Sequence, residues 1–279
     1  MSTDISSYYD QIASLYDATR AMPPEIDEQV TEYILNLVSA TPETKFLEPG
    51  IGTGLNALPI IQRGYSYTGI DISKEMMDEL RRKLQNVPNN LTLIHADASS
   101  LNFPDKSFDV VLMRHMLHLI PDWRRILSEI LRVLKFSGFY LYCESIWTPH
   151  QKEFEQQWRE ILVQQKEYQP PTYEDEDRAG IEQVKKWLIE QGATIETVIA
   201  AEWKVEQTVG ELLDIYQTRN HATCWLIPEY AFPKAMQYFR NRCQKHYGSL
   251  ETILSSNATF GITVVRAGFE QKLSVFAHD

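Results

Sequence analysis

The sequence predicts an α/β protein built on a doubly wound, mostly parallel sheet with helices on both faces. Two observations lead to this prediction. From about residue 41 to Cys143, short apolar runs alternate with stretches whose apolar residues recur at helical spacing, which is the pattern of parallel strands joined by crossover helices. The run Phe46–Gly54 also passes from apolar residues through one acid, Glu48, into three alternating glycines. A strand that bends sharply into a helix at a ligand site has this form.

The first elements follow from spacing. After Pro23 and Pro24, apolar residues recur every three or four positions, so a helix precedes the first strand. The glycines at 50, 52 and 54 remove Cβ atoms at the bend, which lets the backbone turn sharply and approach a ligand closely. The next helix would begin at about Leu55.

The second strand, Tyr67–Asp71, ends in a carboxylate. A carboxylate at the tip of the strand after a glycine turn suits the two hydroxyls of a ribose, which it can accept together. The alternative role of Asp71 is a plain helix cap. Ser73 is the expected N-cap of the following helix. The third and fourth strands are expected at Leu91–His95 and Ser107–Met113.

The pattern changes from Trp147 onward. Apolar spacing predicts helices, a strand from Thr194 to about Glu206, and then further helices that end near Tyr247. Thr208–Glu211 has the form of a capping box, which marks a helix start. An alternating strand, Thr259–Val265, comes last.

A nicotinamide dehydrogenase is a competing interpretation of the glycine turn. Gly52–Ala57 fits the relaxed G-x-G-x-x-A fingerprint of dinucleotide-binding folds. Two features stand against it: Glu48 lies just before the first glycine, and the third strand also ends near an acid, Asp97.

The order of these motifs, together with Phe108–Val111 and Leu131–Lys135, closely resembles the class I S-adenosylmethionine-dependent methyltransferases. The resemblance is strongest to their small-molecule branch, which includes quinone-biosynthesis-type enzymes, and it covers roughly Tyr8 to Glu144. It implies a seven-stranded sheet with an antiparallel seventh strand, and a helical cap inserted after strand five and after strand six. The usual proline-glycine-glycine turn before strand five is Phe136–Gly138 here, and after Ser145 no motif matches.

The expected organisation therefore has four parts. Residues 1–40 would form an N-terminal helical lid, and residues 41–145 the cofactor-binding core. Residues 146–192 would form cap helices, and residues 193–279 would complete the sheet around a second cap insertion at about 208–250.

The resemblance implies S-adenosylmethionine as cofactor and S-adenosylhomocysteine as product. Asp71 would bind the ribose, Glu48 would receive the ammonium group directly or through water, and Asp97 would accept from the adenine amine. The alternative for Glu48 is a structural acid that caps the turn. Residues expected at the cofactor are Tyr16, Arg20, Glu48, Gly50, Gly52, Gly54, Asp71, Ile72, Met76, Asp97, Ala98, Arg114 and Met116.

The N-terminal run Tyr8–Asp17 resembles the lid sequence of the same family. Tyr16 or Tyr8 would close over the methionine end of the cofactor, and Arg20 would pair with its carboxylate. The alternative is an ordinary amphipathic helix that uses Ile12, Leu15 and Tyr16 as core.

The segment after strand four is where the family separates cofactor from substrate. His118 or His115 would serve as general base or as hydrogen-bond donor, although lone histidines are more often structural. Substrate contacts are expected from the lid and the cap, whose aromatic residues have the alternative role of core. These residues are Tyr8, Trp147, Tyr216, His221 and Trp225.

Composition excludes several classes of protein. The formal net charge of −11 over 279 residues opposes a nucleic-acid partner, which needs a basic surface. The three cysteines are widely spaced and form no C-x-x-C, which excludes a disulfide framework and a zinc motif and favours reduced thiols in the cytosol. No basic apolar leader and no apolar run of membrane-spanning length is present. A cytoplasmic protein without a metal site and without membrane insertion is expected.

The function that these observations predict is transfer of the sulfonium methyl of S-adenosylmethionine to a small-molecule acceptor by in-line displacement. An oxygen or protonated nitrogen acceptor would need a base such as His118, whereas a free amine or activated carbon would need none. Two alternatives stay open: a peptide or protein acceptor, and a cofactor-binding module without catalysis.

Overall fold

The computed structural model describes residues 5–114, 116–117, 120, 122–164, 180–221, 223–224 and 227–266, with residues 5–8 described by their backbone alone. A seven-stranded sheet organises this part of the chain, with the strand order β3-β2-β1-β4-β5-β7-β6. Its strands are β1 (Lys45–Pro49), β2 (Ser66–Asp71), β3 (Leu91–His95), β4 (Phe108–Arg114), β5 (Leu134–Ile146), β6 (Thr194–Thr208) and β7 (Ile253–Arg266).

The direction of the strands confirms the predicted fold class. Strands β1 to β5 pair in parallel, and β7 runs antiparallel to both β5 and β6. The carboxyl ends of β1, β2, β3 and β4 therefore meet at one edge of the sheet, where an open α/β fold binds its ligand. In the strand order, β2 and β3 follow on one side of β1, whereas β4 and β5 lie on its other side. The boundary between β1 and β4 is therefore the topological switch point of the sheet.

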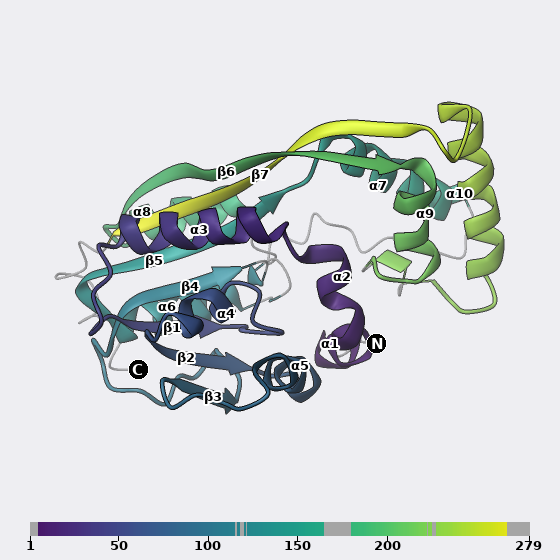
Figure 1. Cartoon of the computed structure of the whole chain (residues 1–279). Helices are drawn as coiled ribbons and strands as arrows, with labels where there is room; N and C mark the ends of the chain where they lie inside the picture. Colours follow the sequence, from purple (N-terminus) through teal and green to yellow (C-terminus); the bar gives the residue numbers. More distant parts are fainter. Residues whose placement is uncertain are drawn as a thin grey trace.

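Helices cover both faces of the sheet, as predicted (Figure 1). The helices and the short 3₁₀ turn η1 are α1 (Ile5–Ile12), η1 (Ala13–Leu15), α2 (Tyr16–Arg20), α3 (Pro24–Leu37), α4 (Ala57–Gln62), α5 (Lys74–Leu84), α6 (Trp123–Val133), α7 (Pro149–Gln164), α8 (Ile181–Glu190), α9 (Val209–Gln217) and α10 (Phe232–Tyr247).

Alternation along β1 shows why both faces are covered. Phe46 packs in one cluster with apolar residues of α3, α4 and α5, while its neighbour Leu47 packs in a second cluster with those of α6 and α8. Successive side chains of a strand point to opposite faces, and both residues have no exposed surface. A strand buried on both sides needs a continuous apolar run, which Phe46-Leu47 begins.

Helix α8 differs from the expected organisation. The sequence analysis assigns residues 146–192 to the cap, but Val184 and Leu188 of α8 pack with α6 and with Val265 of β7. These two side chains are 2% and 1% exposed. The helix thus packs on the core sheet, where its apolar residues are buried.

The cap has a core of its own. Apolar residues of α7, α9 and α10 form a third cluster centred on Trp158, Tyr216 and Phe239. The cap stands at the far end of a two-stranded ribbon formed by the extensions of β6 and β7 (Figure 1). Strand β5 pairs with β7 only as far as Ile146 and Thr259, while β6 and β7 continue to the pair Thr208 and Ile253.

The ribbon explains why β7 begins earlier than predicted. Its first residues, Ile253–Ala258, pair only with β6, so they lack the strict apolar alternation of a strand packed on a core. The observed strand runs from Ile253, whereas alternation identifies only Thr259–Val265.

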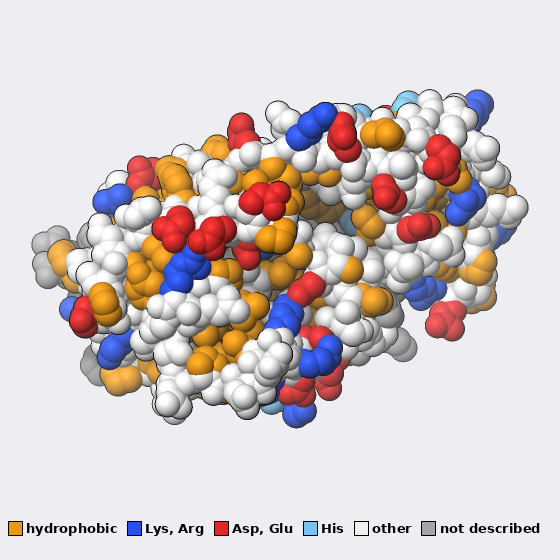
Figure 2. Space-filling model, viewed as in Figure 1, with side chains coloured by type: hydrophobic (Ala, Val, Ile, Leu, Met, Phe, Trp, Pro, Cys, Tyr) orange, Lys and Arg blue, Asp and Glu red, His pale blue; other side chains and the backbone are white. Residues whose placement is uncertain are grey.

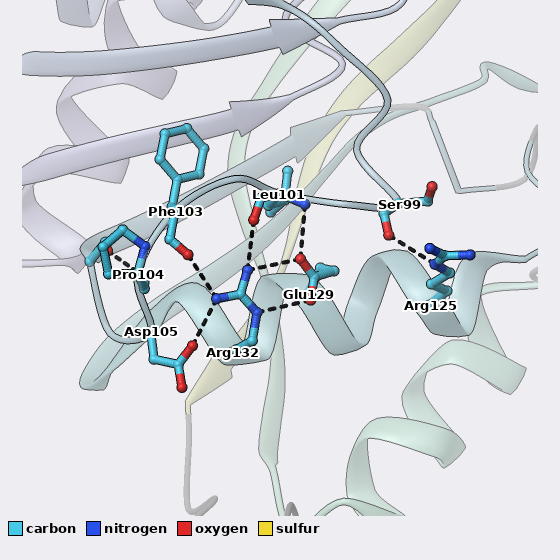
Figure 3. A network of polar contacts seen from close by, with 9 residues as sticks. Ser99, Leu101, Phe103, Pro104, Asp105, Arg125, Glu129 and Arg132 are labelled. Carbon is cyan, nitrogen blue, oxygen red and sulfur yellow. Dashed lines mark hydrogen bonds and ion pairs between the residues drawn. The ribbon is translucent and has the colours of Figure 1, made fainter. Parts of the chain in front are cut away.

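An arginine of α6 fixes the loop after β3 (Figure 3). Arg132 donates from Nη2 to the carbonyl of Leu101 at 2.8 Å and from Nη1 to that of Phe103 at 2.8 Å. It also pairs with Asp105 and with Glu129, whose Oε2 accepts the backbone N–H of Leu101 at 2.8 Å. These hydrogen bonds hold the pKa of Glu129 below its usual range. The motif Leu131–Lys135 therefore anchors the loop that follows Asp97.

Two further observations concern the surface. On the face that Figure 2 shows, acidic and basic side chains lie interspersed with apolar ones. Within the described ranges, none of the helices combines the length and the apolar character needed to cross a bilayer.

Candidate functional site

Three glycines with positive φ form the turn between β1 and α4. The φ angles of Gly50, Gly52 and Gly54 are +74°, +54° and +78°, a region that side chains other than glycine rarely adopt. A Cβ on Gly50 would overlap the sulfur of Met116, and one on Gly54 would lie 2.5 Å from Cδ1 of Leu80. The turn thus requires glycine both for its backbone angles and for its close packing.

The carboxylate of Asp71 ties this turn to the end of β2. Its Oδ2 accepts the backbone N–H of Gly52 at 2.7 Å, and its Oδ1 accepts that of Ser73 at 2.9 Å. Burial raises the pKa of Asp71, and these backbone N–H groups act in the opposite direction. The carboxylate thus lies against the glycine turn, where a ribose diol would need an acceptor.

The N-cap of α5 is Ser73, as predicted, so the cap role does not fall on Asp71. The Ser73 hydroxyl accepts the backbone N–H of Met76 at 3.1 Å. Met76 itself is buried, and its methyl group would lie 3.2 Å from a Cβ on Gly52. Helix α5 is therefore packed directly under the glycine turn.

The end of β3 lies beside the end of β2, because the backbone N–H of Ala96 donates to the carbonyl of Asp71 at 3.0 Å. The exposed Asp97 accepts the backbone N–H of Ser99 at 2.7 Å. Ala98 is buried and Ile72 is 43% exposed. The two apolar residues predicted to contact a purine thus differ in exposure, since only the Ile72 side chain is accessible at the surface.

Glu48 is a buried acid at the end of β1. It is 2% exposed; the Tyr67 hydroxyl donates to Oε2 at 2.7 Å, and Nδ2 of Asn56 donates to Oε1 at 3.4 Å. Burial raises the pKa of Glu48 to about 7 despite these donors. The carboxyl group therefore changes its charge near neutral pH.

Arg114, at the end of β4, makes its hydrogen bonds to protein atoms of three other segments. Nη1 donates to Oδ1 of Asn56 at 3.1 Å, and Nη2 donates to Oγ of Ser145 at 2.8 Å and to the carbonyl of Arg20 at 3.3 Å. Its guanidinium lies 5.2 Å from the ring centre of Phe260. The group joins the glycine turn, β5 and α2.

The N-terminal helices α1, η1 and α2, residues 5–20, are fastened to the same edge by two carboxylates. Asp17 accepts the hydroxyl of Thr53 at 2.5 Å and forms an ion pair with Lys83. Asp10 accepts the hydroxyl of Ser73 at 2.6 Å. Each of these partners lies in the glycine turn or in α5, so the N-terminal helices rest on the candidate site.

Tyr16 and Arg20 lie at the inner end of these helices. The guanidinium of Arg20 lies 4.6 Å from the ring centre of Tyr16 and donates to the carbonyl of Asn220 in the cap at 3.4 Å. Ile12 is buried, whereas Leu15 is 44% exposed. The segment thus uses Ile12 as core while Leu15 stays at the surface.

In the cap, the ring of His221 stacks on that of Tyr216 with 4.8 Å between centres. The Tyr216 hydroxyl and Nε2 of His221 each lie 3.3 Å from Oε2 of Glu155. Burial, together with the positive charges of Arg20 and Arg159, lowers the pKa of His221 to about 3. Nδ1 of His221 lies 2.8 Å from the hydroxyl oxygen of Thr223, so both ring nitrogens have polar neighbours.

Comparison with known proteins agrees with this geometry. Residues 47–142, from the apolar end of β1 through β5, match the family model of a methyltransferase domain. A demethylmenaquinone methyltransferase of Clavibacter sepedonicus is 30% identical over 141 residues, which cover 50% of this chain and 57% of that protein. Residues 47–142 of the chain therefore resemble a methyltransferase domain.

Another relative has a different substrate in its name. A phosphatidylethanolamine N-methyltransferase of Cereibacter sphaeroides is 36% identical over 96 residues, or 34% of this chain and 47% of that protein. The chain thus spans about half the length of the curated relatives that it matches.

A solved structure supports the fold over a longer range. The phosphoethanolamine N-methyltransferase 2 of Haemonchus contortus, in complex with phosphomonomethylethanolamine and S-adenosylhomocysteine, aligns with a TM-score of 0.54 at 18% identity. The alignment covers 94% of this chain and 59% of that one. At this identity the likeness concerns the fold alone.

Most residues predicted for the cofactor lie at the carboxyl edge of the seven-stranded sheet. The glycine turn, Glu48, Asp71 and Asp97 lie at neighbouring strand ends, and Met116 contacts the turn. The predicted residues His115, His118 and Trp225 and the side chain of Tyr8 lie outside the described residues.

The cap residues predicted for substrate have unequal exposure. Tyr216 is 4% exposed and belongs to the cap core, whereas Trp147 is 40% exposed and lies 5.5 Å from His221 between ring centres. Sequence reasoning missed the acids that hold these elements, Asp10, Asp17 and Glu155. Their partners are distant in the chain, so no local pattern marks them.

Proposed function

We propose that the chain binds S-adenosylmethionine at the glycine turn and transfers its methyl group to a small-molecule acceptor. The observation that carries the proposal is the Gly52–Asp71 hydrogen bond at 2.7 Å. It brings a carboxylate against a turn with three glycines, which suits a ribose next to a backbone that needs close approach. The buried acid Glu48 lies at the adjacent strand end, so the residues present fit the cofactor.

The proposed cofactor contacts follow the strand order. Asp71 would hold the ribose hydroxyls, with Ile72, Asp97 and Ala98 at the purine. Glu48, in its ionised form, would attract the ammonium group. Tyr16 and Arg20 would lie at the methionine end, where the N-terminal helices cover the turn.

When bound, S-adenosylmethionine supplies an electrophilic methyl group on a sulfonium. The contribution of the chain is to orient the acceptor in line with that bond and to exclude water. The segment from Arg114 to Leu119 would separate the two ligands, and His118 or His115 would take a proton where the acceptor is a hydroxyl or a protonated amine. A free amine or an activated carbon needs no base.

The acceptor would enter between the strand ends and the cap. Trp147 is the most exposed of the described aromatic residues predicted there, and it stands directly after β5 beside His221. Relatives named for a quinone and for a phospholipid support a small-molecule or lipid-like acceptor. A peptide or protein acceptor is the second candidate, because the cap is large.

A cytoplasmic location is part of the proposal. All three cysteines, Cys143, Cys224 and Cys243, lie among the described residues as buried free thiols. Burial raises the pKa of Cys143 to about 12, so this thiol is not a reactive thiolate. Reduced buried cysteines fit a reducing compartment.

Titration calorimetry tests the cofactor part. We expect binding of S-adenosylmethionine and S-adenosylhomocysteine, and much weaker binding of NAD. Tight NAD binding without binding of either sulfur compound would contradict the proposal. Incubation with methyl-labelled cofactor and fractionated metabolites or peptides then tests catalysis. Label in small molecules supports the first candidate and label in peptides the second, while cofactor binding without any transfer indicates a non-catalytic module.

A further inference from the structure

The guanidinium of Arg114 is buried, which costs free energy for a charged group, and the atoms that accept its hydrogen bonds are neutral. Removal from water lowers the pKa of Arg114, which reflects the cost of burying a cation. The hydrogen bonds go to an amide oxygen of Asn56, a hydroxyl of Ser145 and the peptide carbonyl of Arg20. Three neutral acceptors receive hydrogen bonds from the group, but they do not by themselves explain why a permanent positive charge occupies this position.

The amide of Asn56 connects this charge to Glu48. Its Oδ1 accepts from Arg114 at 3.1 Å, and its Nδ2 donates to Oε1 of Glu48 at 3.4 Å. Tyr67 donates to the other oxygen of Glu48 at 2.7 Å. Since the amide oxygen is engaged by a donor-only group, the amide nitrogen is the end that faces the acid. Four side chains from β4, the glycine turn, β1 and β2 thus form one hydrogen-bonded chain.

The same guanidinium reaches two other segments of the candidate site. Ser145 lies near the end of β5, two residues before Trp147, and Arg20 is the last residue of α2. The Arg114 guanidinium therefore links the end of β5, which leads to the cap, and the N-terminal helices to Asn56 of the glycine turn. A guanidinium has five donors in a fixed fork, which suits this function better than an ammonium group.

We propose that Arg114 is a positioning residue: through Asn56 it orients the Glu48 carboxylate and favours its ionised form, and through Ser145 and Arg20 it fixes the elements on both sides. The inference rests on the proposed function, because it treats Glu48 as the group that attracts the cofactor ammonium. It departs from the expectation that Arg114 contacts the cofactor itself.

The charges around Glu48 determine the direction in which its pKa should change when the Arg114 charge is removed. Arg114 is the cation that acts on Glu48, while Asp71, and Cys143 of β5 if it ionised, would oppose its charge, and Tyr67 and Asn56 donate hydrogen bonds to it. Tyr16 and Asp27 face Arg114 from the N-terminal helices and from α3. Loss of the Arg114 charge removes the positive contribution, so the pKa of Glu48 rises further above about 7.

The test is the pH dependence of S-adenosylhomocysteine binding, measured by titration calorimetry between pH 5.5 and 9. For the wild type, affinity should rise with pH and level off above about 7 as Glu48 becomes ionised. For Arg114→Gln, the midpoint should move upward by about one pH unit, which lowers affinity at neutral pH by up to about tenfold. Arg114→Lys keeps the charge, so its midpoint should return close to that of the wild type.

Two further variants complete the design. Asn56→Ala breaks the hydrogen-bonded chain without removing a charge, and its midpoint should also move upward; it carries the test if Arg114→Gln does not fold. Arg63→Gln is the matched control, since it removes an arginine that pairs with Glu28 and Glu32 on the surface, and its midpoint should equal that of the wild type.

The outcomes are distinguishable. A midpoint in Arg114→Gln and Asn56→Ala equal to that of the wild type would overturn the inference, because a merely structural role lowers stability without moving a titration. Failure of the wild type to bind S-adenosylhomocysteine at any pH would instead contradict the proposed function, and this inference with it.

Discussion

Gly52 and Asp71 are nineteen positions apart in the chain, yet the backbone N–H of the first donates to Oδ2 of the second at 2.7 Å. This bond joins the turn after β1 to the end of β2, so the residue proposed to bind a ribose also holds the turn that the ribose would approach. One carboxylate therefore has a structural role and is also the group proposed to bind the ribose.

The first prediction follows from this double role. Asp71→Ala should weaken cofactor binding by about 1.5–3 kcal/mol, the range for losing hydrogen bonds to a charged group. It should also lower the free energy of unfolding without ligand by about 1–3 kcal/mol, because the N–H groups of Gly52 and Ser73 lose their acceptor. Calorimetry and urea denaturation of the same variant measure both quantities.

Asp71→Asn is the matched control for that variant. The amide oxygen can replace one of the two acceptors, so its loss of stability should be smaller while cofactor binding stays weak. Unchanged stability in Asp71→Ala would show that the two backbone donors find other acceptors.

A second prediction concerns the stability of the fold as a function of pH. The pKa of Glu48 is about 7 in the folded chain and about 4.3 in an unfolded one. Because the folded state holds its proton to higher pH, the contribution of Glu48 to stability is full below about pH 4 and is lost as pH rises through 7. The total loss is about 4 kcal/mol.

Glu48→Gln removes this titration. Relative to the wild type, the variant should therefore gain stability at pH 8 compared with pH 5, and urea denaturation at the two pH values measures the difference. The same difference between wild type and variant at both pH values would mean that Glu48 titrates like an exposed acid.

The third prediction addresses the N-terminal helices. Asp17 forms an ion pair with Lys83, and the two side chains are 34% and 28% exposed. The pair should therefore contribute about 0.5–1 kcal/mol to the packing of the N-terminal helices on α5. Asp17→Asn keeps an acceptor for Thr53 but removes the charge. Dissociation of S-adenosylhomocysteine should become about two- to fivefold faster at low salt, as stopped-flow measurements would report.

Lys83→Met and the double variant serve as controls for that prediction. If the pair acts as a unit, the double variant should dissociate no faster than either single one, and added salt should reduce the difference from the wild type. Additive effects that do not depend on salt would contradict the role of the pair.

The fourth prediction separates the two aromatic residues of the cap region. Tyr216 belongs to the cap core at 4% exposure, whereas Trp147 is 40% exposed. Tyr216→Ala should cost about 3–5 kcal/mol of stability. Trp147→Ala should leave the melting temperature nearly unchanged and should reduce methyl transfer if the acceptor contacts it. Wild-type transfer rates with every acceptor found would remove Trp147 from the substrate site.

How much of the site was predictable depended on distance along the chain. The glycine turn, Asp71 and the N-cap Ser73 follow from local patterns, because a turn needs φ angles above zero and a helix start needs an acceptor. The pairs Asp10–Ser73 and Glu155–Tyr216 join residues about sixty positions apart, and a carboxylate in a helix looks the same in sequence whether it is solvated or bound.

Glu48 shows the same limit in another form. The sequence places an acid at the end of β1 and the resemblance gives it a role, but its charge state depends on Tyr67 and Asn56 and on its burial. Each of these is fixed only when β1, β2 and the turn pack together. The position of Glu48 was therefore easier to predict from the sequence than its charge state.

The direct pairing of Thr208 with Ile253 means that α9, α10 and the turns between them amount to one elaborate hairpin loop. The two strand residues that flank it stay neighbours whatever its length, and the entropy of closing a loop grows only slowly with the number of residues in it. Such a loop can be lengthened, shortened or replaced over generations without rerouting the sheet. Divergence of acceptors among proteins that share this glycine turn would then require changes in this loop and in the face of α7 that packs on it, and not in the order of the strands.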